Sequence, residues 1–188
     1  GAVNEGRADF TPVFLSEIPR LFRNGQLPLD AALIHCSPPD EHGYLSFGVE
    51  VGLTKPAAQN AKIVIAEVNE FMPRALGDSF IHISKVDYMV PVSYRLPEVP
   101  QGTPGELEKK IAEHIVDLIP DGATMQMGIG AIPDAVLHFL NNKRDLGIHT
   151  ELFSDGVIPL VDAGIINNER KTLHPGKIVA GFILGSQR

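Results

Sequence analysis

Short apolar runs recur along the first half of the chain, and turn-forming or polar residues end each of them. Before them, residues 14–22 carry large apolar side chains at helical spacing, which predicts a helix. The runs themselves predict buried strands, and near-continuous apolar strands are typical of a parallel sheet covered on both faces. They are Ala31–Cys36, Tyr44–Val49, Lys62–Val68 and Val86–Val90.

The second half alternates between helical and strand patterns. It follows a segment rich in proline and glycine, Leu96–Gly105, which we interpret as a linker. A helix is expected next, with Leu107, Ile111, Ile115 and Leu118 on one face and Thr103 as its cap. The order of helix, strand, turn, helix and strand favours an α/β architecture. The further predicted elements are strands at 123–127, 147–153 and 177–185 and helices at 134–140 and 157–163.

Composition excludes several classes of protein. Hydrophobic residues make up 44% of the 188 and charged residues 21%, as in an ordinary globular chain. A net charge of −7 without a Lys/Arg cluster argues against nucleic acid as a partner, and no apolar run is long enough for a membrane span. The single Cys36 excludes a disulfide framework. We expect a cytoplasmic protein, and the buried strand at the chain's end predicts that this is a piece of a longer one.

The loop Gly128–Pro133 is the first candidate for chemistry. It lies between a predicted strand and a predicted helix, where glycines let backbone N–H groups approach an anion. Pro133 occupies the place of the third glycine of a dinucleotide fingerprint, and no Lys-Ser/Thr follows as in a Walker A loop. A tight turn without a ligand explains the spacing equally well.

The second candidate is the segment His149–Gly156. Glu151 comes towards the carboxyl end of a predicted strand, which is where open α/β sheets bind ligands. Alternation predicts that Glu151, Phe153 and Asp155 share one face of that strand. The plainer alternatives are a solvated carboxylate at Glu151 and a helix cap at Asp155.

Three further groups have plain structural alternatives. Asp40-Glu41-His42 suggests a metal site, but a solvated polar turn explains the tight spacing better. Asn69 and Arg74 are candidates for contacting a carboxylate or phosphate, against a loop that carries a salt bridge. Cys36 lies in an apolar strand, so we expect an unreactive thiol.

Four motifs, taken in order, resemble the acetyl-CoA hydrolase/transferase family, and most closely its 4-hydroxybutyrate and butyrate:acetate CoA-transferase branch. They extend over essentially the whole chain, so we give them more weight together than singly. They are Ser37-Pro-Pro-Asp-x-His-Gly-Tyr44, Asn69-x-x-Met-Pro-Arg-x-x-Gly-Asp-Ser79, Gly128-Ile-Gly-Ala-Ile-Pro133 and His149-Thr-Glu-x-Phe-Ser-Asp-Gly156.

The resemblance implies an α/β fold of the NagB/RpiA/CoA-transferase type, with open parallel-rich sheets and flanking helices. Residues 1–97 would be the latter part of a first domain, and residues 98–188 the first part of a second. The family's CoA-contacting stretch corresponds to Gly128, Ile129, Gly130, Ala131 and Ile132, and its catalytic glutamate corresponds to Glu151. A later Gly-Gly-Gln segment of the family is absent, as is its N-terminal portion.

The activity that the resemblance implies is transfer of CoA between an acyl-CoA and a short-chain acid of the acetate, butyrate or 4-hydroxybutyrate type. A ping-pong route through a glutamyl-CoA thioester is expected, with CoA as a substrate and no permanently bound cofactor or metal. An acyl-CoA hydrolase that uses the same glutamate and a non-catalytic CoA-binding fragment are the alternatives. A homo-oligomer is expected, because half-domains expose apolar surface.

Overall fold

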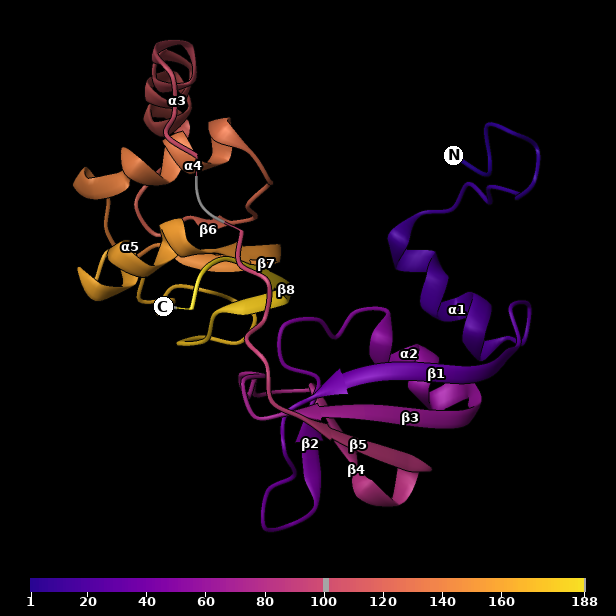
Figure 1. Cartoon of the computed structure of the whole chain (residues 1–188). Coiled ribbons are helices and arrows are strands. Elements are labelled where there is room, and N and C mark those ends of the chain that lie inside the picture. The colour runs from indigo at the N-terminus through magenta and orange to yellow at the C-terminus, as the bar shows by residue number, and fades with distance from the viewer. Residues whose placement is uncertain (100–101, 188) are drawn as a thin grey trace. The chain divides into compact units, whose positions relative to one another are not determined.

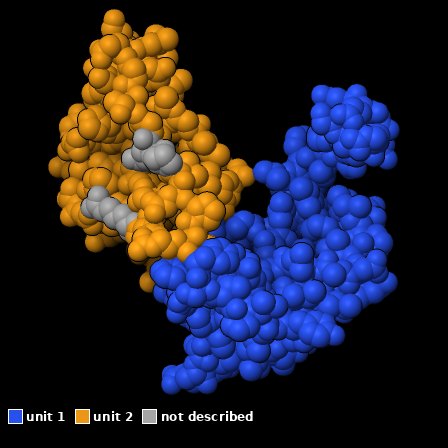
Figure 2. Space-filling model, in the orientation of Figure 1, with its two compact units in different colours: residues 1–94 blue, residues 95–188 orange. Residues whose placement is uncertain are grey.

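The computed structural model describes residues 1–99 and 102–187, so Pro100 and Gln101 of the predicted linker lie outside the described residues. Two compact units form, over residues 1–94 and 95–188 (Figure 2). Each contains a three-stranded parallel sheet with helices packed on it, which confirms the predicted α/β class (Figure 1). No helix in the described part of the chain has the length and apolarity needed to cross a bilayer.

Unit 1 is built on a parallel sheet of strand order β1-β3-β5. A second, antiparallel ribbon pairs β2 with β4, so the prediction of one parallel sheet is wrong for the strand that starts at Tyr44. The strands are β1 Leu29–Cys36, β2 Tyr44–Ser46, β3 Ala61–Asn69, β4 Phe80–His82 and β5 Tyr88–Val92. The helices are α1 Ile18–Arg23 and α2 Thr54–Asn60, with 3-10 turns at Leu15–Glu17 and Ile83–Lys85.

The two faces of the unit 1 sheet differ in their surroundings. One face contributes Ala32, Ile34, Cys36, Val64 and Ala66 to a core with side chains of α2 and the β2–β4 ribbon. The opposite face exposes large apolar side chains, which are Leu33, Ile63, Tyr88 and Val90, at 80, 42, 62 and 48%. A parallel sheet is normally covered on both sides, so this face, which we call the open face, is unusual.

Strand β5 continues through Pro91, where the sequence predicts its end. It is an edge strand, paired only with β3, so the N–H that proline lacks is tolerated there.

Unit 2 is a parallel sheet of order β6-β7-β8 under a layer of helices. Its strands are β6 Thr124–Met125, β7 Gly147–Ser154 and β8 Val179–Leu184. Its helices are α3 Glu106–Leu118, α4 Ala131–His138 and α5 Ile158–Asp162, with 3-10 turns at Leu140–Asn142 and Asp155–Val157. The core collects Val116, Leu140, Leu146, Ile148 and Leu160 from these elements. The terminal strand is half-buried, because β8 lies at the sheet's edge.

Helix α3 differs from the prediction in its start and in its buried face. It begins at Glu106 after Gly105, and Thr103 does not cap it. Ala112 and Val116 are the buried residues, whereas Leu107 and Leu118 are exposed at 66 and 82%. Ala112 and Val116 belong to the core of unit 2, whereas the two leucines lie in the first and last turns of the helix.

Candidate active site

The central strand of the unit 2 sheet positions Glu151. Along β7, Ile148, Thr150 and Leu152 are buried and His149 and Glu151 are exposed. This alternation confirms that Glu151 points away from the face that carries Thr150 and Leu152. The strand continues to Ser154, so Glu151 lies within its second half rather than at its very end.

A pair of hydrogen bonds attaches the candidate glycine loop to this strand. The N–H of Met127 donates to Thr150 Oγ1 at 2.9 Å, and that hydroxyl donates to the carbonyl of Met127 at 3.2 Å. Residue 127 is thereby held beside β7, two residues after β6 ends. Thr150 is not among the residues expected from the sequence to act in the site, although a hydroxyl in an otherwise apolar strand face is a signal for such a role.

The loop therefore starts next to Glu151. The register of β6 and β7 pairs Thr124 with Gly147 and Met125 with Ile148. Beyond Met125, the Thr150 hydroxyl holds Met127 beside the residue that precedes Glu151, and Gly128 follows directly in the loop. The structure thus brings together the two regions that the sequence singled out separately.

Helix α4 begins inside the predicted turn. Gly130 is its N-cap, with φ +120° and ψ −177°, a conformation essentially restricted to glycine. The helix starts at Ala131, three residues before the predicted start, so Ala131 and Ile132 form its first turn. Their N–H groups have no partner within the helix, and the helix dipole favours an anion in front of them. Ile129, just before the cap, is 70% exposed.

The carboxylate of Asp155 links the ends of the neighbouring strands β7 and β8 by a hydrogen bond. Its Oδ2 accepts the N–H of Ser186 at 2.9 Å, just after β8. Asp155 makes no capping hydrogen bond to α5, so the predicted helix cap at Asp155 is wrong. The reason is that the turn at 155–157 aims this carboxylate across to β8 instead of along the chain. Ser154 makes no capping hydrogen bond to the 3-10 turn that precedes α5.

The polar motif after β1 is a turn held by Asp40. That carboxylate accepts the N–H groups of His42 at 3.0 Å and Tyr44 at 2.8 Å and pairs with Arg74. The Tyr44 N–H, followed by the His42 N–H and the Arg74 charge, keeps the pKa of Asp40 below its usual value. Arg74 also donates to the carbonyl of Tyr44 at 3.0 Å. These contacts agree with the plainer alternatives given above, a polar turn at Asp40-Glu41-His42 and a loop at Arg74 that carries a salt bridge.

A metal site at this turn is not formed. Over residues 1–99 and 102–187 the structure has no cluster of three or more metal-ligating side chains of the His, Cys, Asp or Glu type.

Asn69 and Cys36, two further candidates from the sequence, are both buried in unit 1. Asn69 is fully buried; its Nδ2 donates to the carbonyl of Tyr94 at 2.9 Å and its Oδ1 accepts the N–H of Phe71 at 3.1 Å. Cys36 is buried as well, and desolvation raises the pKa of its thiol to about 12. A thiol of that pKa is protonated at neutral pH, in agreement with the expected lack of reactivity.

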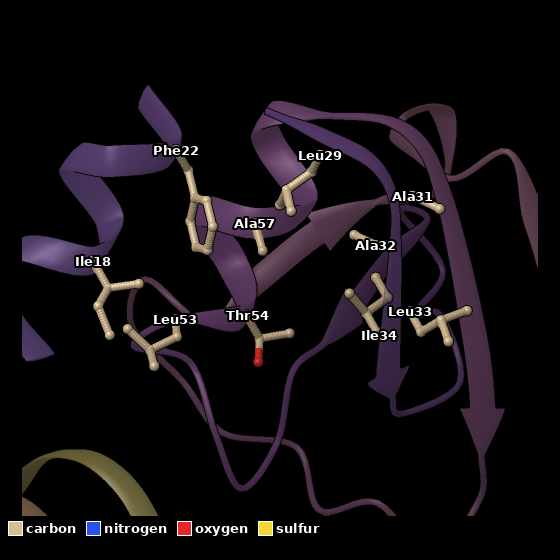
Figure 3. A pocket seen from close by; sticks show the side chains of 10 residues that line it. All are labelled: Ile18, Phe22, Leu29, Ala31, Ala32, Leu33, Ile34, Leu53, Thr54 and Ala57. Carbon is tan, nitrogen blue, oxygen red and sulfur yellow. The ribbon is translucent and has the colours of Figure 1, made fainter. Parts of the chain in front are cut away.

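Unit 1 also contains an apolar pocket of about 300 Å³ (Figure 3). Side chains of α1, β1 and α2 line it, and Thr54 supplies the one polar side chain among those labelled there. Ile18, Phe22 and Leu53 are among the apolar ones. It offers no ionisable group for acyl or phosphate chemistry, so the candidate active site remains the pairing of Glu151 with the glycine loop.

Comparison with known proteins gives consistent matches. Residues 1–94 match the family described as the acetyl-CoA hydrolase/transferase N-terminal domain. The whole chain is 60% identical to the 4-hydroxybutyrate coenzyme A transferase of Clostridium kluyveri and 50% identical to a succinyl-CoA:acetate/propanoyl-CoA:succinate CoA transferase of Fasciola hepatica.

A solved structure agrees with these sequence matches. The crystal structure of 4-hydroxybutyrate CoA-transferase from Porphyromonas gingivalis superimposes with a TM-score of 0.89 at 47% identity, over 98% of this chain and 48% of that one. The chain spans 44 and 39% of the lengths of the Clostridium and Fasciola relatives, so it corresponds to less than half of each.

Proposed function

The chain belongs to the acetyl-CoA hydrolase/transferase family, and on that premise we propose that its parent protein transfers CoA between an acyl-CoA and a short-chain carboxylic acid. The observation that carries the proposal is the exposed carboxylate of Glu151 beside the loop at 128–132. The relatives named for 4-hydroxybutyrate and for acetate support short-chain acids as substrates.

Glu151 is proposed as the covalent nucleophile. One of its carboxylate oxygens attacks the acyl carbonyl, the C–S bond breaks, and a glutamyl-acyl anhydride and CoA thiolate result. The thiolate then attacks the glutamyl carbonyl, which forms the Glu151–CoA thioester and expels the first acid as a carboxylate. A second carboxylate reverses both steps, so ping-pong kinetics are expected.

The loop of Gly128, Ile129, Gly130, Ala131 and Ile132 is proposed to contact CoA. Its support is the left-handed Gly130 and the free N–H groups in the first turn of α4, which suit an anionic group or a developing oxyanion. A chain of net charge −7 does not attract CoA as a whole, so a local site of this kind is needed.

The domain assignment is part of the same proposal. Residues 1–97 would complete one CoA-transferase-like domain and residues 98–188 would begin the next. The family match at 1–94 and the division into two compact units support it. A homo-oligomer is proposed too, supported by the open face of the unit 1 sheet. The cytoplasmic location expected from the sequence stays a prediction.

Hydrolysis is the second candidate function, since the family's description includes acetyl-CoA hydrolases. In that case water would attack the glutamyl thioester and release CoA. The short span of this chain favours a third outcome for the isolated piece, which is CoA binding without turnover.

The decisive experiment is intact-mass spectrometry of the full-length parent after incubation with butyryl-CoA. A CoA adduct that maps to Glu151, disappears on borohydride treatment and is absent from Glu151→Gln is the expected result. Glu113→Gln, an exposed carboxylate on α3, is the matched control and should keep the adduct. Acyl exchange with acetate then identifies a transferase, and CoA release without exchange a hydrolase. Acyl exchange that persists in Glu151→Gln would contradict the assignment.

A further inference from the structure

Gly181 lies in the middle of β8, directly beside Glu151. The register of β7 and β8 pairs Thr150 with Ala180 and Leu152 with Phe182, which leaves Gly181 as the neighbour of Glu151 across the two strands. Neighbouring residues of paired strands point to the same face, so residue 181 is the position that would carry the side chain next to the Glu151 carboxylate.

The backbone conformation does not explain a glycine at this position. Gly181 is not among the glycines with positive φ, and its strand conformation is open to any residue. Glycine inside a strand weakens a sheet, and it often marks a place where another backbone approaches closely. Some other constraint must therefore favour it here.

That constraint is the peptide of Glu151. A Cβ added to Gly181 would lie 3.1 Å from the carbonyl oxygen of Glu151 and 3.8 Å from its Cα. The first distance is tighter than nearly all contacts that real Cβ atoms make, so one of the two groups would have to shift by a few tenths of an ångström. Because the crowded atom is a backbone oxygen, relief would require the Glu151 peptide or the β8 backbone beside it to move.

The 128–132 loop starts on the other side of β7. The Thr150 hydroxyl, one residue before Glu151, holds Met127 there. Glu151 therefore lies between β8 on one side and the start of the loop on the other.

We propose that Gly181 is a positioning residue for the Glu151 nucleophile, an inference that rests on the function proposed above. Its missing side chain lets β8 pack against the Glu151 peptide and fixes the carboxylate relative to the 128–132 loop. Gly181 itself makes no bond to the substrate.

The test measures single-turnover adduct formation in the full-length parent for wild type, Gly181→Ala and Ala180→Val. Ala180 is exposed on the same strand, and its side chain points to the opposite face, so its variant controls for added bulk on β8. A displaced nucleophile is expected to form the adduct about tenfold more slowly, or worse, in Gly181→Ala. The dissociation constant of CoA should change by no more than about twofold, because ground-state binding is retained. Ala180→Val should resemble wild type.

Three other results would contradict the inference, and the measurements tell them apart. If Gly181→Ala forms the adduct at the wild-type rate, Gly181 does not position Glu151, although the proposed function stands. If the variant loses CoA binding and thermal stability together while Ala180→Val does not, Gly181 serves the packing of the sheet. If wild type itself forms no adduct on Glu151, the proposed function fails first, and the inference fails with it.

Discussion

The hydroxyl of Thr150 both accepts the N–H of Met127 and donates to its carbonyl. One side chain therefore replaces the ladder hydrogen bonds that β6 no longer provides after Met125. The strand that carries Glu151 and the loop proposed to hold CoA are fastened at this point.

Thr150→Val should uncouple the loop from β7 without changing the side chain's shape. The buried N–H and carbonyl of Met127 would lose their partner, which costs about 1–3 kcal/mol of unfolding free energy. CoA binding should weaken as well, because the first residues of the loop lose their anchor. Urea denaturation and CoA titration of the parent protein measure both effects. Thr150→Ser keeps the hydroxyl and should keep CoA affinity, and a Val variant that binds CoA normally would contradict the role given to the hydroxyl.

Gly130→Ala should damage the start of α4. A side chain at φ +120° is strained by about 1–3 kcal/mol, whatever space surrounds it. The chain is expected to relieve that strain by moving the N–H groups of Ala131 and Ile132, so CoA affinity should fall. Gly102→Ala is the control, because a Cβ at Gly102 meets no atom within 4 Å and its φ is not left-handed. Equal CoA affinity of the two variants would show that the loop geometry does not matter for binding.

Lys171 should make stability depend on alkaline pH. It is buried, its ammonium donates to the carbonyls of Ile148 (2.7 Å) and Lys177, and burial lowers its pKa from 10.5. Between the lowered pKa and 10.5 the unfolded chain binds more protons than the folded one, so the free energy of unfolding rises with pH in that window. Lys171→Met should flatten this rise in urea denaturation measured from neutral pH to pH 10.5. An unchanged slope would show that Lys171 titrates alike in both states.

Asp40 should contribute to acid unfolding of unit 1. The Tyr44 N–H, the His42 N–H and Arg74 lower its pKa below 3.8, so its stabilising effect is present above that value and is lost as the pH falls through the lowered pKa. Asp40→Asn should reduce the loss of stability on acidification, as followed by circular dichroism. Asp9→Asn, at an exposed carboxylate in the same unit, should leave the acid profile unchanged. A profile that is the same for the Asp40 variant and wild type would contradict the effect.

The strands and the orientation of Glu151 could be predicted because they depend on local periodicity. Alternation along β7 is a property of eight consecutive residues, and it correctly places Thr150 opposite Glu151. The antiparallel pairing of Tyr44 with His82 depends instead on residues 38 positions apart, and no pattern within either segment specifies it. The same is true of Asp155, whose partner Ser186 lies 31 residues further on.

The start of α4 at Ala131 lies earlier than the sequence predicts, for a different reason. Pro133 is typical of a turn, but proline is also compatible with the first turn of a helix, where its missing N–H has no partner to lose. The conformation of Gly130 decides between the two, and a backbone dihedral angle is not visible in a sequence.

The open face of the unit 1 sheet has a practical consequence for laboratory work. Leu33 and Tyr88 lie on it at 80 and 62% exposure, next to Ile63 and Val90. An exposed apolar surface of this kind promotes self-association as the protein concentration rises. Light scattering of the isolated 188 residues should therefore increase steeply with concentration. Kinetic constants for this piece would then vary with the dilution at which they are measured.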